Sequence, residues 1–224
     1  AYMSKSNKAV KSVLILVIFT LGSKFLGFIR ETLIGAKFGS GILTDTYIIA
    51  LSATSLFSLL ISRSINNTMI PILSEVESKE GKEGKIFHTN NLLNMIIIIS
   101  TIFTIIAWFF SPFIIKIIGS GFQGEQLQLA ILLMRIGIPT ILFSSIQGIF
   151  RGYLQSEMMF TETAVSSLPF NFVYIFFLLF LSKYFGIIGL MVTSVVASFT
   201  QILVQIPSIK KMGFKYVNFE DDNF

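Results

Sequence analysis

Charged side chains inside otherwise apolar stretches are the residues whose chemistry is most informative. Lys24, Arg30 and Glu31 share one such stretch, while Arg63 and Arg135 lie in two others. A charge inside a bilayer costs at least ~2.5 kcal/mol on insertion scales, so each of these groups needs a partner or water. On a helix, Lys24 and Glu31 project within ~20° of each other, and Arg30 projects about 120° from Lys24. We therefore expect one helix to present a mixed polar stripe.

If the basic residues converge in the interior of one helix bundle, they favour the binding of an anionic ligand. An arginine guanidinium binds phosphate through two parallel hydrogen bonds and stays charged at any working pH, which suits a diphosphate headgroup. The alternative is internal ion pairing only, of Arg30 with Glu31 or Asp45, and of Lys24 with Glu31. The residues alone leave both interpretations open.

Other kinds of chemistry lack the residues they need. The chain has no cysteine and one histidine, His88, which excludes thiolate and multi-histidine metal centres within it. The sequence contains no HExxH, GxSxG, Walker-type phosphate loop or EF-hand spacing. We predict that the protein is not an enzyme and uses no cofactor or metal.

The elements that position these charges are long apolar segments. Of the 224 residues, 53% are hydrophobic and 13% are charged, whereas soluble domains carry about 25% charged residues. The apolar runs are two to three times longer than the ~10-residue strands of membrane barrels, so helices are expected. We predict an all-α membrane protein, a bundle of six transmembrane helices. The expected spans are 10–38, 42–73, 90–110, 127–153, 164–181 and 187–206, with a hydrophilic loop at 75–85.

Lysine and arginine counts predict the orientation in the membrane. With the N-terminus inside, ten fall in inner segments: Lys5, Lys8, Lys11, Lys79, Lys82, Lys85, Arg151, Lys210, Lys211 and Lys215. Three fall outside, namely Lys37, Lys116 and Lys183. Both termini are therefore expected in the cytoplasm, and the net charge of +5 reflects membrane topology rather than nucleic-acid binding.

The chain divides into three predicted parts. These are a cytoplasmic N-terminus at 1–9, a transmembrane lobe at 10–208 and a cytoplasmic tail or linker at 209–224. The tail alternates apolar residues with lysines, which suits a helix lying on an anionic membrane surface, or equally a solvated flank. Two glycine pairs, Gly35 with Gly39 and Gly148 with Gly152, have the spacing of close helix packing.

Several motifs resemble those of one transporter family. The stretch from Ser23 to Glu31 (SKFLGFIRE), followed by Phe38-Gly39 and by Thr44 to Tyr47 (TDTY), resembles the opening of the MurJ (MviN) lipid II flippases. That family belongs to the multidrug/oligosaccharidyl-lipid/polysaccharide exporter superfamily. The stretches from Ile70 to Glu75 and from Gln205 to Gly213 are also similar to it, so the resemblance runs from about residue 10 to residue 220.

The resemblance implies a transporter of the bacterial inner membrane. It would move a polyprenyl-diphosphate-linked cell-wall precursor, lipid II, across the bilayer by alternating access. By motif match, Arg30 takes the diphosphate-binding role, with Glu31 at the family's acidic position. Lys24 stands where the family commonly has arginine, and Asp45 matches the acid after the first loop.

Two departures from the family pattern matter. Where the family often has an arginine pair midway in the second helix, this chain has Thr54 to Ser58 (TSLFS), with Arg63 a turn further on as the candidate substitute. The family also has two six-helix lobes, whereas this chain supplies only the first. We therefore expect the N-terminal lobe of a flippase, either a fragment or a half-transporter, that needs a second lobe or a homodimer partner.

Three alternative functions remain open at this point. The first is a flippase for another lipid-linked polysaccharide. The second is a lobe of a cation-coupled drug exporter, which would want acidic residues deep in the bundle. The third is a non-transporting membrane scaffold subunit whose intramembrane charges are permanently paired.

Overall fold

The computed structural model describes residues 2–216, and it describes side chains over 13–65 and 67–216. Four helical stretches in this part are long and apolar enough to cross a membrane: Val13–Phe38, Ile42–Ile118, Gly124–Ser156 and Phe160–Lys211. The described residues contain no strand. The predicted all-α class is therefore confirmed.

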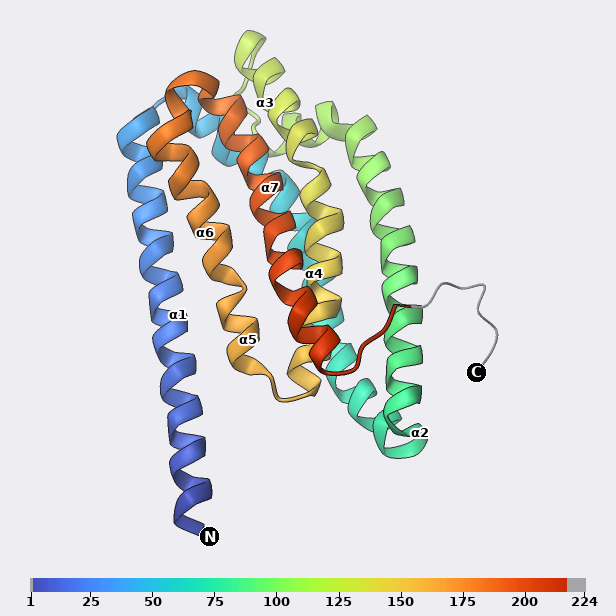
Figure 1. Ribbon diagram of the computed structural model, residues 1–224. Helices are drawn as coiled ribbons and strands as arrows, with labels where there is room; N and C mark the ends of the chain where they lie inside the picture. Colours follow the sequence, from blue (N-terminus) through green and yellow to red (C-terminus); the bar gives the residue numbers. More distant parts are fainter. Residues whose placement is uncertain (1, 217–224) are drawn as a thin grey trace.

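The first two helices account for half of the chain. Helix α1 covers Tyr2–Phe38, so it begins earlier than the predicted start at residue 10. Gly39 follows its last residue, Phe38, and has a φ of +73°, a left-handed conformation that favours glycine. Helix α2 covers Ile42–Ile118 and contains one non-helical residue, Gly81, with φ 73° and ψ −169°. The chain reverses direction there, so the two halves of α2, 42–80 and 82–118, run antiparallel (Figure 1).

The predicted hydrophilic loop at 75–85 is wrong, because these residues are helical on both sides of Gly81. Polar composition did not prevent helix formation here, since Lys79 and Glu75 form an ion pair one turn apart. Lys85 also lies inside the bundle rather than in solvent. The turn between the two halves is therefore confined to a single glycine.

The remaining helices pack against α2. They are α3 (Gly124–Gly137), α4 (Pro139–Ser156), α5 (Phe160–Val165), α6 (Ser167–Phe176), the π-helical turn η1 (Phe177–Leu181) and α7 (Ser182–Lys211). Pro139 begins α4, where its missing N–H is tolerated, and so it marks the break from α3. Gly186, with φ 58°, interrupts α7, and the chain reverses a second time near it (Figure 1).

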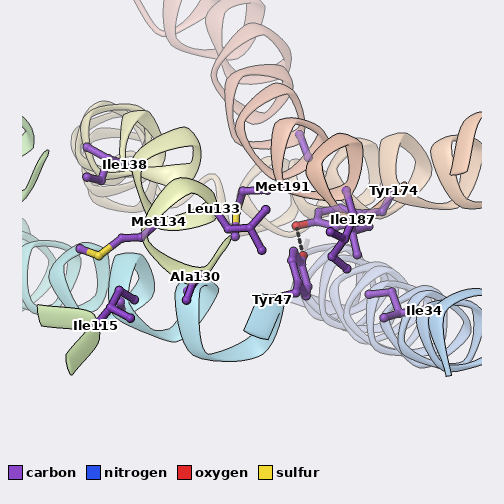
Figure 2. Close-up of a cluster of buried hydrophobic side chains, with 14 of the residues drawn as sticks. Ile34, Tyr47, Ile115, Ala130, Leu133, Met134, Ile138, Tyr174, Ile187 and Met191 are labelled. Carbon is purple, nitrogen blue, oxygen red and sulfur yellow. Dashed lines mark hydrogen bonds between the residues drawn. The ribbon is translucent and has the colours of Figure 1, made fainter. Parts of the chain in front are cut away.

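Two apolar clusters form the core. One surrounds Tyr47, Leu133, Met134 and Met191 toward the α3 end of the bundle (Figure 2). The other joins the far end of α4 to α7 and α2, and includes Leu73, Leu93, Tyr153, Leu154, Ile202 and Phe214. Together they fix the helices that carry the charged residues.

Small residues let α4 approach the first half of α2. An ideal Cβ on Gly152 would lie 2.7 Å from Met69 Sδ, and one on Gly148 would lie 3.5 Å from Ile65 Cδ1. The predicted packing role of this glycine pair is therefore confirmed. Gly35 has no atom within 4 Å of its ideal Cβ, so no described residue packs on it.

The segment after α7 differs from a continued surface helix. Helix α7 ends at Lys211, and Gly213 (φ 89°) caps it through a hydrogen bond from its N–H to Lys210 O of 3.0 Å. Residues 212–216 are not helical, and Phe214 is buried against the bundle. The rest of the predicted tail, 217–224, lies outside the described residues.

Candidate functional site

Arg30 is held at the contact between α1 and α6. Its guanidinium donates to Glu31 Oε1 from Nη2 at 2.7 Å and from Nε at 3.1 Å. Nη1 donates to Asn171 Oδ1 at 3.2 Å. The guanidinium carbon also lies 5.2 Å from the centre of the Tyr174 ring and 5.5 Å from that of Phe170. Of the predicted ion pairs of Arg30, the one with Glu31 is therefore formed.

The sequence of α1 explains why Arg30 reaches α6. Ser23, Gly27 and Arg30 have the spacing of one helix face. Ser167 Oγ donates to Ser23 Oγ at 2.7 Å, and an ideal Cβ on Gly27 would lie 3.9 Å from Asn171 Oδ1. These two small residues, Ser23 and Gly27, thus leave room for Asn171 beside the arginine.

Two buried tyrosines lie behind Arg30. The hydroxyl oxygens of Tyr47 on α2 and Tyr174 on α6 are 3.1 Å apart, the hydrogen bond drawn in Figure 2. The two residues are each 2% exposed. Because the Tyr174 ring also faces the Arg30 guanidinium, the pair connects the arginine to α2.

Asn171, Tyr47 and Tyr174 were missed by the sequence reasoning. Each is a polar residue within an apolar stretch, which is the available signal, but nothing in the spacing names its partner. Asn171 is 4% exposed and has three partners: Arg30, Ser23 and Ser167. It is the residue that orients the predicted diphosphate-binding arginine.

The other predicted site residues of α1 and early α2 are exposed. Lys24, Glu31, Asp45 and Arg63 all have open side chains, and the Glu31 side chain is 65% exposed. Within residues 13–65 and 67–216, neither Lys24, Asp45 nor Arg63 forms an ion pair. The predicted alternative pairing of Lys24 with Glu31 is therefore not formed. We call Lys24, Arg30, Glu31, Asp45 and Arg63 the charged set.

The two halves of α2 present different outer surfaces. Exposed residues of the first half include Asp45, Ser55, Arg63, Asn67 and Thr68, among leucines. Exposed residues of the second half include Ile98, Ile102, Ile105, Trp108, Phe109, Phe110, Phe113 and Ile117. Residues 98–117 suit contact with acyl chains, because Thr101 and Lys116 are the only exposed polar residues among them. The first half suits a wetter environment.

Arg135 belongs to a different part of the bundle. Its Nε donates to Ser111 Oγ at 2.8 Å, and its guanidinium lies 4.4 Å from the Trp108 ring centre. Both partners are on the second half of α2, which lies at the opposite edge of the view from α1 (Figure 1). The side chains that contact the Arg135 guanidinium, Ser111 and Trp108, differ from those that contact Arg30. The membership of Arg135 in one cationic chamber therefore stays a prediction.

Three polar residues on α4 and α7 have buried side-chain atoms without a partner in the described part of the chain. Gln147 Nε2, Arg151 Nε and both terminal atoms of Gln205 have no hydrogen-bond partner among the described protein groups. Arg151 was predicted as a topology determinant, and the two glutamines were not singled out. Among the described residues, no group of three or more histidine, aspartate or glutamate side chains could hold a metal ion.

Comparison with known proteins identifies the family. The family model described as lipid II flippase MurJ matches residues 34–223. A probable lipid II flippase MurJ of Buchnera aphidicola subsp. Baizongia pistaciae is 32% identical over 209 residues, which is 91% of this chain and 41% of the relative. The lipid II flippase MurJ of Burkholderia cenocepacia is 25% identical, covering 87% of this chain and 39% of the relative.

Solved structures show the same fold. A lipid II flippase MurJ in an inward closed conformation matches with a TM-score of 0.73 and 26% identity, over 91% of this chain and 43% of that one. A transporter of the MOP superfamily from Pyrococcus furiosus matches with a TM-score of 0.74 and 13% identity, which bears on the fold alone.

These matches cover most of this chain but less than half of each relative. The chain spans about two fifths of the length of the curated relatives it matches. The family model nevertheless covers most of the chain, and the first relatives are about one third identical to it. The chain belongs to the MurJ lipid II flippase family.

Proposed function

We propose that this chain is the N-terminal lobe of a flippase that moves lipid II across the bacterial inner membrane. The lobe crosses the membrane six times with both termini in the cytoplasm. Two of the four apolar helical segments contain a chain reversal, at Gly81 and at Gly186, so counting each side of these reversals separately gives six passes. The lysine and arginine distribution supports the orientation.

The observation that carries the proposal is the setting of Arg30. Asn171 and Tyr174 hold one side of its guanidinium, while its carboxylate partner, Glu31, is 65% exposed. An exposed ion pair contributes little stability, so a diphosphate can displace Glu31 at small cost. The arginine then binds the phosphate oxygens through its planar fork. Lys24 and Arg63 supply further positive charge, and Glu31 and Asp45 limit it so that the product is released.

Transport requires a second lobe facing the charged set. It is provided either by the same polypeptide or by a second copy of this chain. The contrast between the polar first half of α2 and its apolar second half supports a water-filled cavity on the side of α1 and early α2. Alternating opening of that cavity to the two leaflets moves the headgroup while the polyprenyl chain stays in lipid.

The test measures lipid II at the outer leaflet of cells depleted of their own flippase. The chain is expressed together with its second lobe, and Arg30→Ala is compared with wild type. We expect Arg30→Ala to lower outer-leaflet lipid II by about tenfold or more, since it removes a charge-assisted phosphate contact. Arg30→Lys should give a smaller loss, because lysine keeps the charge without the planar fork.

The matched control is Lys116→Ala, which removes an exposed cation outside the charged set. It should transport like wild type. Full rescue by a stably expressed Arg30→Ala variant would overturn the diphosphate-binding role.

One alternative also has structural support. The Arg30–Glu31 ion pair fits a scaffold subunit whose intramembrane charges are permanently neutralised. Lys24 and Arg63, which form no ion pair with any described residue, fit it poorly. A scaffold would show no dependence of outer-leaflet lipid II on Arg30. A cation-coupled exporter has less support, because Glu31 on α1 and Asp45 at the start of α2 are exposed rather than deep in the bundle.

A further inference from the structure

Lys85 is a fully buried cation at the end of the bundle where α2 reverses. Its Nζ donates to Glu77 Oε2 and to Glu157 Oε1, each at 2.7 Å. Its side chain is 0% exposed, while those of Glu77 and Glu157 are 41% and 15% exposed. The lysine thus joins both sides of the Gly81 turn to the residue that caps α4.

Tyr153 connects this ion cluster to the segment that follows α7. Lys85 Nζ lies 5.5 Å from the centre of the Tyr153 ring. The Tyr153 hydroxyl donates to Met212 O at 3.2 Å, and its ring centre lies 5.4 Å from that of Phe214. Tyr153 is 1% exposed, so its ring cannot shift without displacing the residues packed around it.

Residues 212–216, which we call the exit segment, are held by two further hydrogen bonds, and Gly213 lies close to Lys82. Asn90 Nδ2 donates to Lys215 O at 2.8 Å, and the Tyr216 hydroxyl donates to Asn94 Oδ1 at 2.8 Å. An ideal Cβ on Gly213 would lie 3.2 Å from Lys82 Cε. The exit segment therefore lies across the second half of α2, which faces it with two asparagine side chains one turn apart.

We propose that Lys85 is a positioning residue for the exit segment. By pairing with both Glu77 and Glu157 it holds the end of α4 against the α2 reversal, which keeps Tyr153 in contact with Met212 and Phe214. Without the lysine, two carboxylates would face each other and the end of α4 would separate from α2. The cluster thereby fixes the position of the exit segment up to Tyr216, the last described residue.

The experiment uses one spin label on the full chain, which contains no native cysteine. Lys215→Cys is labelled because its side chain is exposed while its backbone carbonyl is bound by Asn90. The mobile fraction of the label is measured by electron paramagnetic resonance in wild type and in Lys85→Met. We expect Lys85→Met to raise the mobile fraction about fivefold or more, and Tyr153→Phe, which removes one hydrogen bond, to raise it about twofold.

Two further variants keep the test decisive. Lys79→Met removes an exposed lysine whose partner is Glu75, so the label should remain immobile. If Lys85→Met does not fold, Lys85→Met with Glu157→Gln removes the repulsion between the two carboxylates and keeps the net charge of the wild-type cluster, so it should fold with a mobile label. A folded Lys85 variant with an immobile label would overturn the proposal, as would equal mobilisation by Lys79→Met. Because no transport is measured, the result is independent of the proposed function.

Discussion

Arg30 Nη1 lies 3.2 Å from Asn171 Oδ1, across 141 residues of sequence. The basic side chain that the sequence places within an apolar helix is thus oriented by an amide of a different helix. The amide nitrogen of Asn171 is committed to the Ser167 carbonyl at 3.2 Å, so its oxygen faces the arginine. Because Asn171 is neutral, it orients the Arg30 guanidinium without cancelling its positive charge.

Replacing this amide by a carboxylate should give Arg30 a second anionic partner. In Asn171→Asp one carboxylate oxygen pairs with Arg30 at the α1–α6 contact, while the other faces the Ser23 and Ser167 carbonyl oxygens to which the amide nitrogen donates. We expect the thermal unfolding midpoint to fall modestly, because the ion pair offsets part of the lost hydrogen bonding, and outer-leaflet lipid II to fall about fivefold or more, because the carboxylate competes with the diphosphate. Phe172→Leu, at an exposed neighbour, is the control. Wild-type transport by Asn171→Asp would show that a second carboxylate beside Arg30 does not interfere with transport.

The hydrogen bond between Tyr47 and Tyr174 should appear as a coupling energy. Each single change to phenylalanine leaves a buried hydroxyl without this partner and should lower the free energy of unfolding by about 1 kcal/mol. Tyr47→Phe with Tyr174→Phe removes both hydroxyls, so its loss should be smaller than the sum of the two. Additive losses in a double-mutant cycle of chemical denaturation would argue that the hydroxyls do not interact.

Composition alone was enough to predict the all-α class. Long apolar runs with few charges leave no other arrangement that satisfies backbone hydrogen bonds in a membrane. The close contact of Gly148 and Gly152 with α2 was also predictable, because small residues spaced four apart are a local pattern. Residues 75–85 were wrongly predicted to be a loop because they are polar. The polar composition did not reveal that ion pairs would stabilise helix on both sides of the reversal.

Partners distant in the sequence could not be predicted. The sequence identified Arg30 as informative, but Asn171 reaches it only through the packing of α1 on α6. Lys85 was counted as a loop lysine, since its partner Glu157 is 72 residues away and nothing local indicates burial. Local spacing names which side chains share a helix face, whereas the tertiary fold decides which faces meet.

Glycine packing gives a third prediction, on stability. Gly152→Val adds atoms where the ideal Cβ already lies 2.7 Å from Met69 Sδ, so α4 and α2 must separate. We expect the free energy of unfolding to fall by about 1–3 kcal/mol. Gly35→Val, in another helix with nothing within 4 Å, should change it much less. Chemical denaturation in detergent compares the two, and equal losses would contradict the packing described for α4.

The central claim is that the charged set borders water rather than lipid. Lys24 and Phe25 test it closely, because both are exposed neighbours on α1 at nearly the same depth but project about 100° apart. Lys24→Cys and Phe25→Cys are made singly in the chain, which has no cysteine of its own. Each is then reacted, in membranes and with the second lobe present, with a water-soluble thiol reagent.

Because the reagent attacks the thiolate, which forms only where water is present, the two labelling rates compare hydration of the two faces directly. The account predicts that Cys at position 24 reacts about tenfold faster or more than Cys at position 25. Complete protection of both positions, or equal reaction of both, would contradict it.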